Sequence, residues 1–112
     1  MFSNKNSKQK SEALRKILDR KGIISMPGCF DALSAKLIER EGIEVGFMSG
    51  FSVSSTKLGM PDTGLISFSE MLEQVKNISN ATSIPFIFDG DTGYGNSVNV
   101  YRTVRGYADA GA

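Results

Sequence analysis

Histidine is absent from this sequence of 112 residues, and cysteine occurs once, as Cys29. Without histidine, these residues can form neither a His-based zinc site nor a Ser-His-Asp triad, and they offer no His general base. A single cysteine excludes an internal disulfide and is typical of a reducing compartment. We therefore expect a cytoplasmic protein in which Cys29 is a small packing residue.

Long hydrophobic runs and a strong charge imbalance are also missing. No segment approaches the roughly 20 apolar residues that a membrane span needs, and the first residues lack the apolar centre of a secretory signal. The formal net charge is only +1. The composition therefore gives no reason to expect a nucleic acid or a membrane as a partner.

The most informative segment is the apolar run 84–88, which ends at two carboxylates, Asp89 and Asp91. An apolar run of this length, bounded by turn residues, is typical of a strand buried on both faces. Parallel α/β proteins place their chemistry at the carboxyl ends of such strands. No cationic side chain lies between Ile84 and Asn96, so the two carboxylates would repel each other without a positive partner. A divalent metal is the simplest partner, and a polar strand end with a turn is the alternative.

Helix caps and apolar spacing predict the elements around this run. We expect residues 1–7 to be disordered, strands over 22–27, 45–49 and 84–88, and a long loop over 50–66 that is functional or disordered. Four helices are expected, with Ser11, Asp31 and Ser67 as caps of the first three and the fourth beginning near Asn96. The residues expected to face the core are Leu14, Ile17 and Leu18, then Leu33, Leu37 and Ile38, then Met71, Val75 and Ile78, and finally Val100, Val104 and Tyr107.

This order of helices and strands predicts an α/β fold with a parallel sheet and right-handed crossovers. A closed (β/α)8 barrel takes roughly 250 residues, more than twice the length of this chain. We therefore interpret residues 1–112 as a single partial domain, a leading helix and about three βα units from the amino-terminal part of such a barrel, cut before its fourth strand.

Four separated segments occur in an order and spacing that resemble the isocitrate lyase/phosphoenolpyruvate mutase superfamily. They are 26–35 (MPGCFDALSA), 47–50 (FMSG), 58–62 (LGMPD) and 89–96 (DGDTGYGN). The likeness is closer to its branch of methylisocitrate lyases, dimethylmalate lyases, oxaloacetate decarboxylases and carboxyphosphonoenolpyruvate mutase. The resemblance implies a (β/α)8 barrel in a homotetramer, a small carboxylate substrate and Mg²⁺ as the cofactor, with Mn²⁺ as a possible substitute.

The resemblance also implies roles for individual residues. Asp89 and Asp91 match the metal-site aspartates, with Asp89 the nearer match to a direct ligand. Asp62 matches an acidic catalytic residue on a mobile segment at the rim of the site. The residues that match the substrate-binding segments are Ser49, Gly50 and Phe51, together with Gly93, Tyr94, Gly95 and Asn96. Backbone N–H groups beside Ser49 and Gly50 are expected to act as an oxyanion-type site.

The implied activity is cleavage of a C–C bond, decarboxylation or P–C rearrangement through an enolate-like intermediate. The family's glutamate at the metal site, its Cys-containing loop and its carboxylate-binding arginine would lie beyond residue 112, so we expect this fragment alone to be inactive. Two alternatives remain open. The aspartate pair also suggests a haloacid-dehalogenase-like phosphatase, although position 93 is glycine where that motif needs Thr or Val. The chain could also be a non-catalytic, truncated interaction module.

Overall fold

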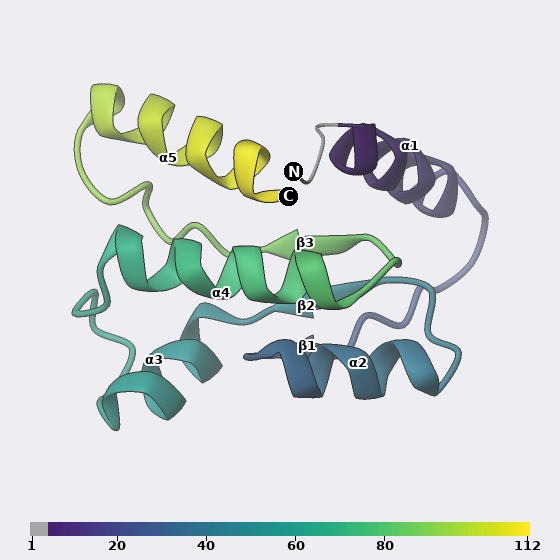
Figure 1. Cartoon of the computed structure of the whole chain (residues 1–112), viewed down its shortest axis with the longest axis horizontal. Helices are drawn as coiled ribbons and strands as arrows, with labels where there is room; N and C mark the ends of the chain where they lie inside the picture. The colour runs from purple at the N-terminus through teal and green to yellow at the C-terminus, as the bar shows by residue number, and fades with distance from the viewer. Residues whose placement is uncertain (1–4) are drawn as a thin grey trace.

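The computed structural model describes residues 5–112 as a three-stranded parallel sheet with helices packed around it (Figure 1). The elements are α1 (Lys5–Leu18), β1 (Gly28–Cys29), α2 (Ala32–Arg40), β2 (Gly46–Met48), α3 (Gly50–Leu58), α4 (Phe68–Ala81), β3 (Phe86–Phe88) and α5 (Ser97–Ala110). The strand order is β1-β2-β3, so each strand pairs with the next one along the chain. The predicted α/β fold with a parallel sheet is confirmed.

The core lies between the sheet and the helices that cover it. Helix α4 packs against both α2 and α5, and its predicted apolar stripe of Met71, Val75 and Ile78 is buried. These side chains meet Cys29 of β1 and Met48 of β2 in one cluster. None of the helices in the described part of the chain combines the length and the apolar content needed to cross a bilayer.

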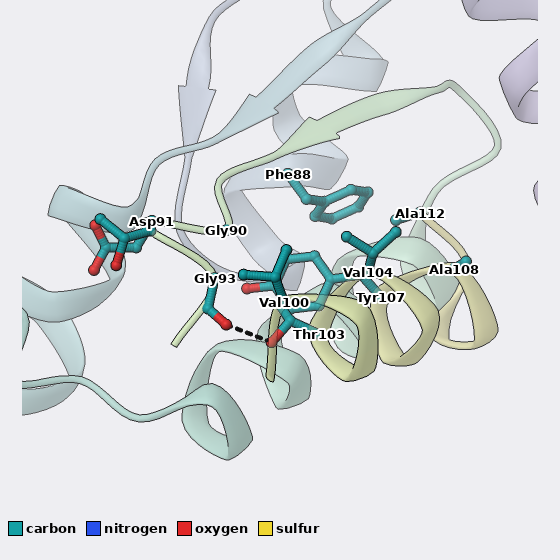
Figure 2. A pocket seen from close by; sticks show the side chains of 11 residues that line it. Phe88, Gly90, Asp91, Gly93, Val100, Thr103, Val104, Tyr107, Ala108 and Ala112 are labelled. Carbon is teal, nitrogen blue, oxygen red and sulfur yellow. Dashed lines mark hydrogen bonds between the residues drawn. The ribbon is translucent and has the colours of Figure 1, made fainter. Parts of the chain in front are cut away.

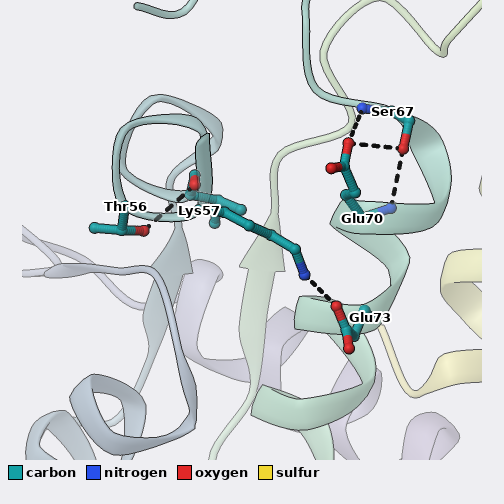
Figure 3. Close-up of polar contacts among 6 residues, drawn as sticks. Thr56, Lys57, Ser67, Glu70 and Glu73 are labelled. Carbon is teal, nitrogen blue, oxygen red and sulfur yellow. Dashed lines mark hydrogen bonds and ion pairs between the residues drawn. The ribbon is translucent and has the colours of Figure 1, made fainter. Parts of the chain in front are cut away.

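Three of the predicted helix caps are present. Asp31, Ser67 and Asn96 each accept a backbone N–H in the first turn of α2, α4 and α5, and each takes part in a reciprocal capping box. Figure 3 shows the box at Ser67, where the Glu70 carboxylate accepts the Ser67 N–H. Nearby, an ion pair between Lys57 and Glu73 joins α3 to α4 (Figure 3).

Two predictions near the amino terminus are wrong. Ser11 lies inside α1, which begins at Lys5, so part of the segment expected to be disordered is helical; residues 1–4 lie outside the described part. Segment 22–27 is not a strand. The ladder with β2 begins only at the Pro27 carbonyl, which accepts the Phe47 N–H at 3.0 Å, and β1 follows it. Among the described residues, no strand is paired with the residues before Pro27.

The prediction of a loop over 50–66 is also wrong, because the first half of this segment is helix α3. Ser49 caps α3 by accepting the Ser52 N–H, and Val53 is buried against the core. Gly59 ends the helix in the left-handed conformation at φ 62°, as glycines commonly do. The second half of the expected loop lacks regular structure, and this connection runs from residue 59 to residue 67.

Some residues expected to face the core point to solvent. Leu33 and Leu37 of α2 are 67% and 51% exposed, and Val104 of α5 is 63% exposed. Ala35 and Thr103 occupy the buried faces of these helices instead. The sequence shows that a helix has an apolar face, but the neighbours present in the fold decide which side of the helix is covered. Leu18 of α1 is likewise 47% exposed.

Candidate active site at the carboxyl ends of the strands

The pairing of β2 with β3 brings the Ser49–Gly50 segment beside Asp89. Gly46 permits this pairing, because a Cβ at that position would lie 2.2 Å from Cε1 of Phe86. Met48 is the partner of Phe88, and its carbonyl accepts the Asp89 N–H at 3.2 Å. The residues that follow β2 and β3 therefore leave the sheet at the same edge, as the sequence predicted.

The Asp89 carboxylate is held from two sides. Its Oδ2 accepts the Gly50 N–H at 3.0 Å, and its Oδ1 accepts the Asp91 N–H at 2.8 Å. Gly50 is the first residue of α3, and a helix amino terminus favours a negative charge. A Cβ on Gly50 would lie 2.6 Å from Oδ2, so only glycine allows the carboxylate to approach this closely.

The backbone donors expected from the sequence are already engaged. The Ser49 N–H donates to the Cys29 carbonyl at 3.0 Å, as part of the sheet, and the Gly50 N–H donates to Asp89. The Phe51 N–H lies in the first turn of α3, where no carbonyl of the helix can accept it. It has no acceptor in the part of the chain that the structure describes. That N–H and the Ser49 hydroxyl, which also finds no acceptor among the described residues, are the donors left for a ligand.

The turn after β3 has an unusual backbone. Asp91 and Tyr94 adopt φ values of 49° and 61°, which are rare for residues other than glycine, and Gly93 has φ 92°. The Gly93 N–H closes the turn on the Gly90 carbonyl at 2.9 Å. Asp91 is exposed at this turn, whereas Gly93 is buried.

Two tyrosines pack beneath the same turn. The Tyr107 hydroxyl of α5 donates to the Asp89 carbonyl at 3.0 Å, and the Tyr94 hydroxyl lies 3.4 Å from the Tyr107 hydroxyl. Burial is the main cause that raises the pKa of both phenols above the ordinary value of 10.0. Both hydroxyls therefore stay protonated at neutral pH and act as hydrogen-bonding groups.

An open cavity of about 520 Å³ lies between β3 and α5, beside the turn (Figure 2). Its walls are mainly apolar, with Phe88, Val100 and Val104 among them, and Asp91 lies at one end. Phe88 belongs to β3, which is an edge strand of the three-stranded sheet.

The structure brings together some of the predicted site residues and leaves others apart. Ser49 and Gly50 meet Asp89 directly, and Tyr94 reaches the same region through Tyr107. Asp62 is exposed in the connection 59–67, and its carboxylate makes no hydrogen bond or ion pair with any described residue. The remaining predicted residues do not direct a polar side chain at the aspartates. Phe51 is 60% exposed, Gly95 has no side chain, and the Asn96 amide caps α5.

The aspartates fit a partial magnesium site. Among the described residues there is no cluster of three or more His, Cys, Asp or Glu side chains that could hold a metal. Mg²⁺, however, is usually bound through one or two carboxylates together with waters and substrate oxygens. Each Asp89 oxygen accepts one hydrogen bond and keeps a lone pair, and neither aspartate belongs to an ion pair in the described part of the chain. The donor set therefore suits a hard cation whose other ligands come from elsewhere.

Cys29 takes no part in this chemistry. Its side chain is fully buried, and burial raises the pKa of its thiol to about 11. Because the thiolate is the reactive form, the buried thiol is inert at neutral pH. The prediction of a packing residue is confirmed.

Sequence reasoning missed two side chains of α5 that contact the turn. Thr103 donates its hydroxyl to the Gly93 carbonyl at 2.9 Å, and Tyr107 donates to Asp89. Tyr107 was predicted only as an apolar core residue, and Thr103 was not predicted at all. Their spacing could have indicated these contacts, because residues i and i+4 lie on the same helix face. A polar Thr on a buried face needs a hydrogen-bond partner.

Comparison with known proteins places the chain in a family. The family model described as phosphoenolpyruvate phosphomutase matches residues 14–112. The chain is 43% identical over 98 residues to carboxyvinyl-carboxyphosphonate phosphorylmutase of Arabidopsis thaliana, a chloroplastic protein, covering 87% of this chain and 29% of that protein. It is 44% identical over 98 residues to 2,3-dimethylmalate lyase of Eubacterium barkeri, covering 88% of this chain and 34% of that protein.

A solved structure of phosphonopyruvate hydrolase in complex with oxalate and Mg²⁺ superposes with a TM-score of 0.86 and 40% identity, covering 92% of this chain and 36% of that one. The chain thus spans about a third of the length of the relatives it matches. The family assignment replaces the phosphatase alternative. The fold, the ordered motifs and these relatives agree that the chain belongs to the phosphoenolpyruvate phosphomutase family, within the isocitrate lyase/phosphoenolpyruvate mutase superfamily of carbon–carbon lyases and phosphonomutases.

Proposed function

We propose that this chain carries the Mg²⁺-binding and carboxylate-binding part of an active site for small 2-oxo or 2-hydroxy carboxylic acids. The observation that carries the proposal is the Asp89 carboxylate fixed at the amino terminus of α3, next to the turn that bears Asp91. The names of the relatives support it, since one acts on 2,3-dimethylmalate and another was solved with oxalate and Mg²⁺.

Asp89 and Asp91 are the residues proposed to hold the metal, directly or through bound water. When bound, Mg²⁺ would act as a Lewis acid that stabilises negative charge developing on the substrate oxygens. Mn²⁺ favours the same oxygen ligands and could replace it. Two observations support this role: the Gly50 N–H holds the Asp89 carboxylate, and Asp91 is exposed in the turn after β3.

The amino terminus of α3 is proposed to bind the substrate carboxylate. A helix amino terminus offers N–H groups and a positive dipole to an anion. Here the Phe51 N–H and the Ser49 hydroxyl are the donors that the described residues leave free. In the enolate-like intermediate these donors would also favour the added negative charge. The turn Gly93–Asn96 would form the neighbouring wall of the site.

Asp62 is proposed to act from the connection between α3 and α4. This segment carries two left-handed glycines, Gly59 at φ 62° and Gly64 at φ 77°, on either side of Asp62. A segment of this kind can change conformation at its glycines, close over a substrate and exclude water from a reactive intermediate. The Asp62 carboxylate would then reach the substrate only in the closed form.

The sheet itself is proposed to form the first three strands of a (β/α)8 barrel. Its outer strands, β1 and β3, each have one unpaired edge in the described structure. In a longer polypeptide, further strands would pair with these edges and cover the cavity beside β3. The reaction would be C–C cleavage, decarboxylation or P–C rearrangement, and we expect residues 1–112 alone to be inactive. The homotetramer, the cytoplasmic location and the single partial domain stay predictions.

Calorimetric titration of the chain with Mg²⁺, with and without oxalate, tests the proposal. We expect Mg²⁺ uptake by the unaltered chain, enhanced by oxalate, and no uptake by Asp89→Ala. Asp19→Ala is the matched control, because Asp19 is an exposed acid outside the site. In a polypeptide that completes the barrel, Asp89→Ala should abolish Mg²⁺-dependent turnover. Equal Mg²⁺ affinity in Asp89→Ala and the unaltered chain would remove the metal site from the proposal.

A further inference from the structure

The turn that bears the two aspartates is fastened to a single face of α5. The Tyr107 hydroxyl donates to the Asp89 carbonyl at 3.0 Å, and the Thr103 hydroxyl donates to the Gly93 carbonyl at 2.9 Å. Figure 2 shows the bond from Thr103 to Gly93 and the Tyr107 side chain beside it. The two bonds therefore tie down the backbone on both sides of Asp91.

Both donors are largely buried, so these bonds have little competition from water. Thr103 is 5% exposed and Tyr107 is 7% exposed. They lie four residues apart and so occupy neighbouring positions on one helix face. Val100 completes the contact, because a Cβ on Gly93 would lie 2.3 Å from Cγ2 of Val100. The turn is thus in close contact with α5 at one end and hydrogen-bonded to it at both ends.

The turn needs such support because its backbone is unfavourable. Asp91 and Tyr94 both hold φ in the left-handed region, at 49° and 61°. Conformations of this kind persist only where the surrounding structure imposes them. The bond from the Asp91 N–H to Asp89 Oδ1 depends on the same turn geometry. The direction of both carboxylates therefore depends on how α5 holds the turn.

We propose that Thr103 and Tyr107 are positioning residues for the divalent-cation site, setting the placement of Asp89 and Asp91 without touching the metal. This inference rests on the proposed function, because it presumes that these aspartates bind Mg²⁺. Partners that orient metal-ligating side chains typically change metal affinity about 10–100-fold when they are removed. We expect a loss of that size when either hydroxyl is deleted.

The test compares Mg²⁺ affinity across variants of the full chain by calorimetry. Thr103→Val and Tyr107→Phe remove one hydroxyl each and keep the size of the side chain, and both should raise the Mg²⁺ dissociation constant about 10-fold or more. Thr103→Ser keeps the hydroxyl and should restore the affinity of the unaltered chain. Tyr101→Phe is the matched control, since Tyr101 is 70% exposed on the outer side of α5.

Amide hydrogen exchange of the metal-free chain supplies the second measurement. In Thr103→Val and Tyr107→Phe, the amides of Asp91 and Gly93 should exchange faster while those of α4 keep their protection, which separates a loosened turn from a chain that fails to fold. Unchanged Mg²⁺ affinity and unchanged exchange in both variants would overturn this inference and leave the proposed function standing. An unaltered chain that takes up no Mg²⁺ would overturn both.

Discussion

The position of Gly50 against the Asp89 carboxylate predicts the outcome of Gly50→Ala. A Cβ at position 50 would lie 2.6 Å from Asp89 Oδ2 and 2.9 Å from its Cγ. Because Gly50 opens α3 and its N–H binds that same oxygen, the carboxylate must move away and give up this bond. The substitution therefore acts on the metal site and on folding together.

The size of the effect follows from two opposing contributions. A hydrogen bond to a charged group contributes roughly 1.5–3 kcal/mol to the free energy of unfolding. Replacing a helical glycine by alanine recovers about 0.5–1 kcal/mol, because glycine loses more backbone entropy on folding. We therefore expect Gly50→Ala to lower the free energy of unfolding by about 0.5–2.5 kcal/mol, the difference between these contributions.

Urea denaturation followed by circular dichroism measures this change, and calorimetry measures the accompanying loss of Mg²⁺ affinity. Gly28→Ala is the matched control, because its Cβ would meet only Ser49 Cβ at 3.9 Å and the Phe47 carbonyl at 4.0 Å. We expect that control to be as stable as the unaltered chain. If Gly50→Ala were as stable as Gly28→Ala and bound Mg²⁺ equally well, the argument that Gly50 holds Asp89 in place would be refuted.

Two further predictions concern contacts that join distant elements. The Ser83 hydroxyl and the N–H groups of Ser83 and Ile84 donate to the Glu39 carboxylate, and the hydroxyl is the main cause that lowers the pKa of Glu39 below 4.5. A carboxyl whose pKa is lower in the folded than in the unfolded state stabilises the fold at pH values above its unfolded-state pKa, and this stability is lost as pH falls through its folded-state pKa. Glu39→Gln should therefore lose less stability than the unaltered chain when the pH falls below about 4.5 in acid titration. An unaltered pH profile would contradict this. Buried Lys10 of α1 donates to two carbonyls at the end of α4, at 2.8 and 2.6 Å. Lys10→Met should lower the free energy of unfolding, measured by chemical denaturation, by about 1–3 kcal/mol. Lys8→Met, an exposed control on the same helix, should change it little. Equal stability of the two variants would show that Lys10 does not hold the helices together.

The parts of the fold that depend on local chemistry could be predicted from the sequence. Asp31, Ser67 and Asn96 cap helices because their side chains reach backbone groups only two or three residues away. The meeting of Ser49–Gly50 with Asp89 was also predictable, because the carboxyl ends of parallel strands share one edge of the sheet. These inferences need the order of the elements and no knowledge of side-chain packing.

The parts that depend on tertiary contact could not be predicted. Helix α3 is rich in Ser and Thr, which favour caps and turns over helix interiors. It forms because Ser49 caps it and Val53 is buried against the core, and most of the stability of a short helix comes from such packing. The contacts of Thr103 and Tyr107 with the turn depend in the same way on where α5 docks.

A crystal structure of the chain grown with Mg²⁺ and oxalate is the most direct test of the central claim, that Asp89 and Asp91 form one cation site at the carboxyl ends of the strands. We predict an octahedral ion bound to at least one of these carboxylates at about 2.0–2.1 Å, with oxalate oxygens and waters as the other ligands. Oxalate should lie against the amino terminus of α3. An ion bound elsewhere on the chain, or both carboxylates directed into bulk solvent with no ion beside them, would contradict the account.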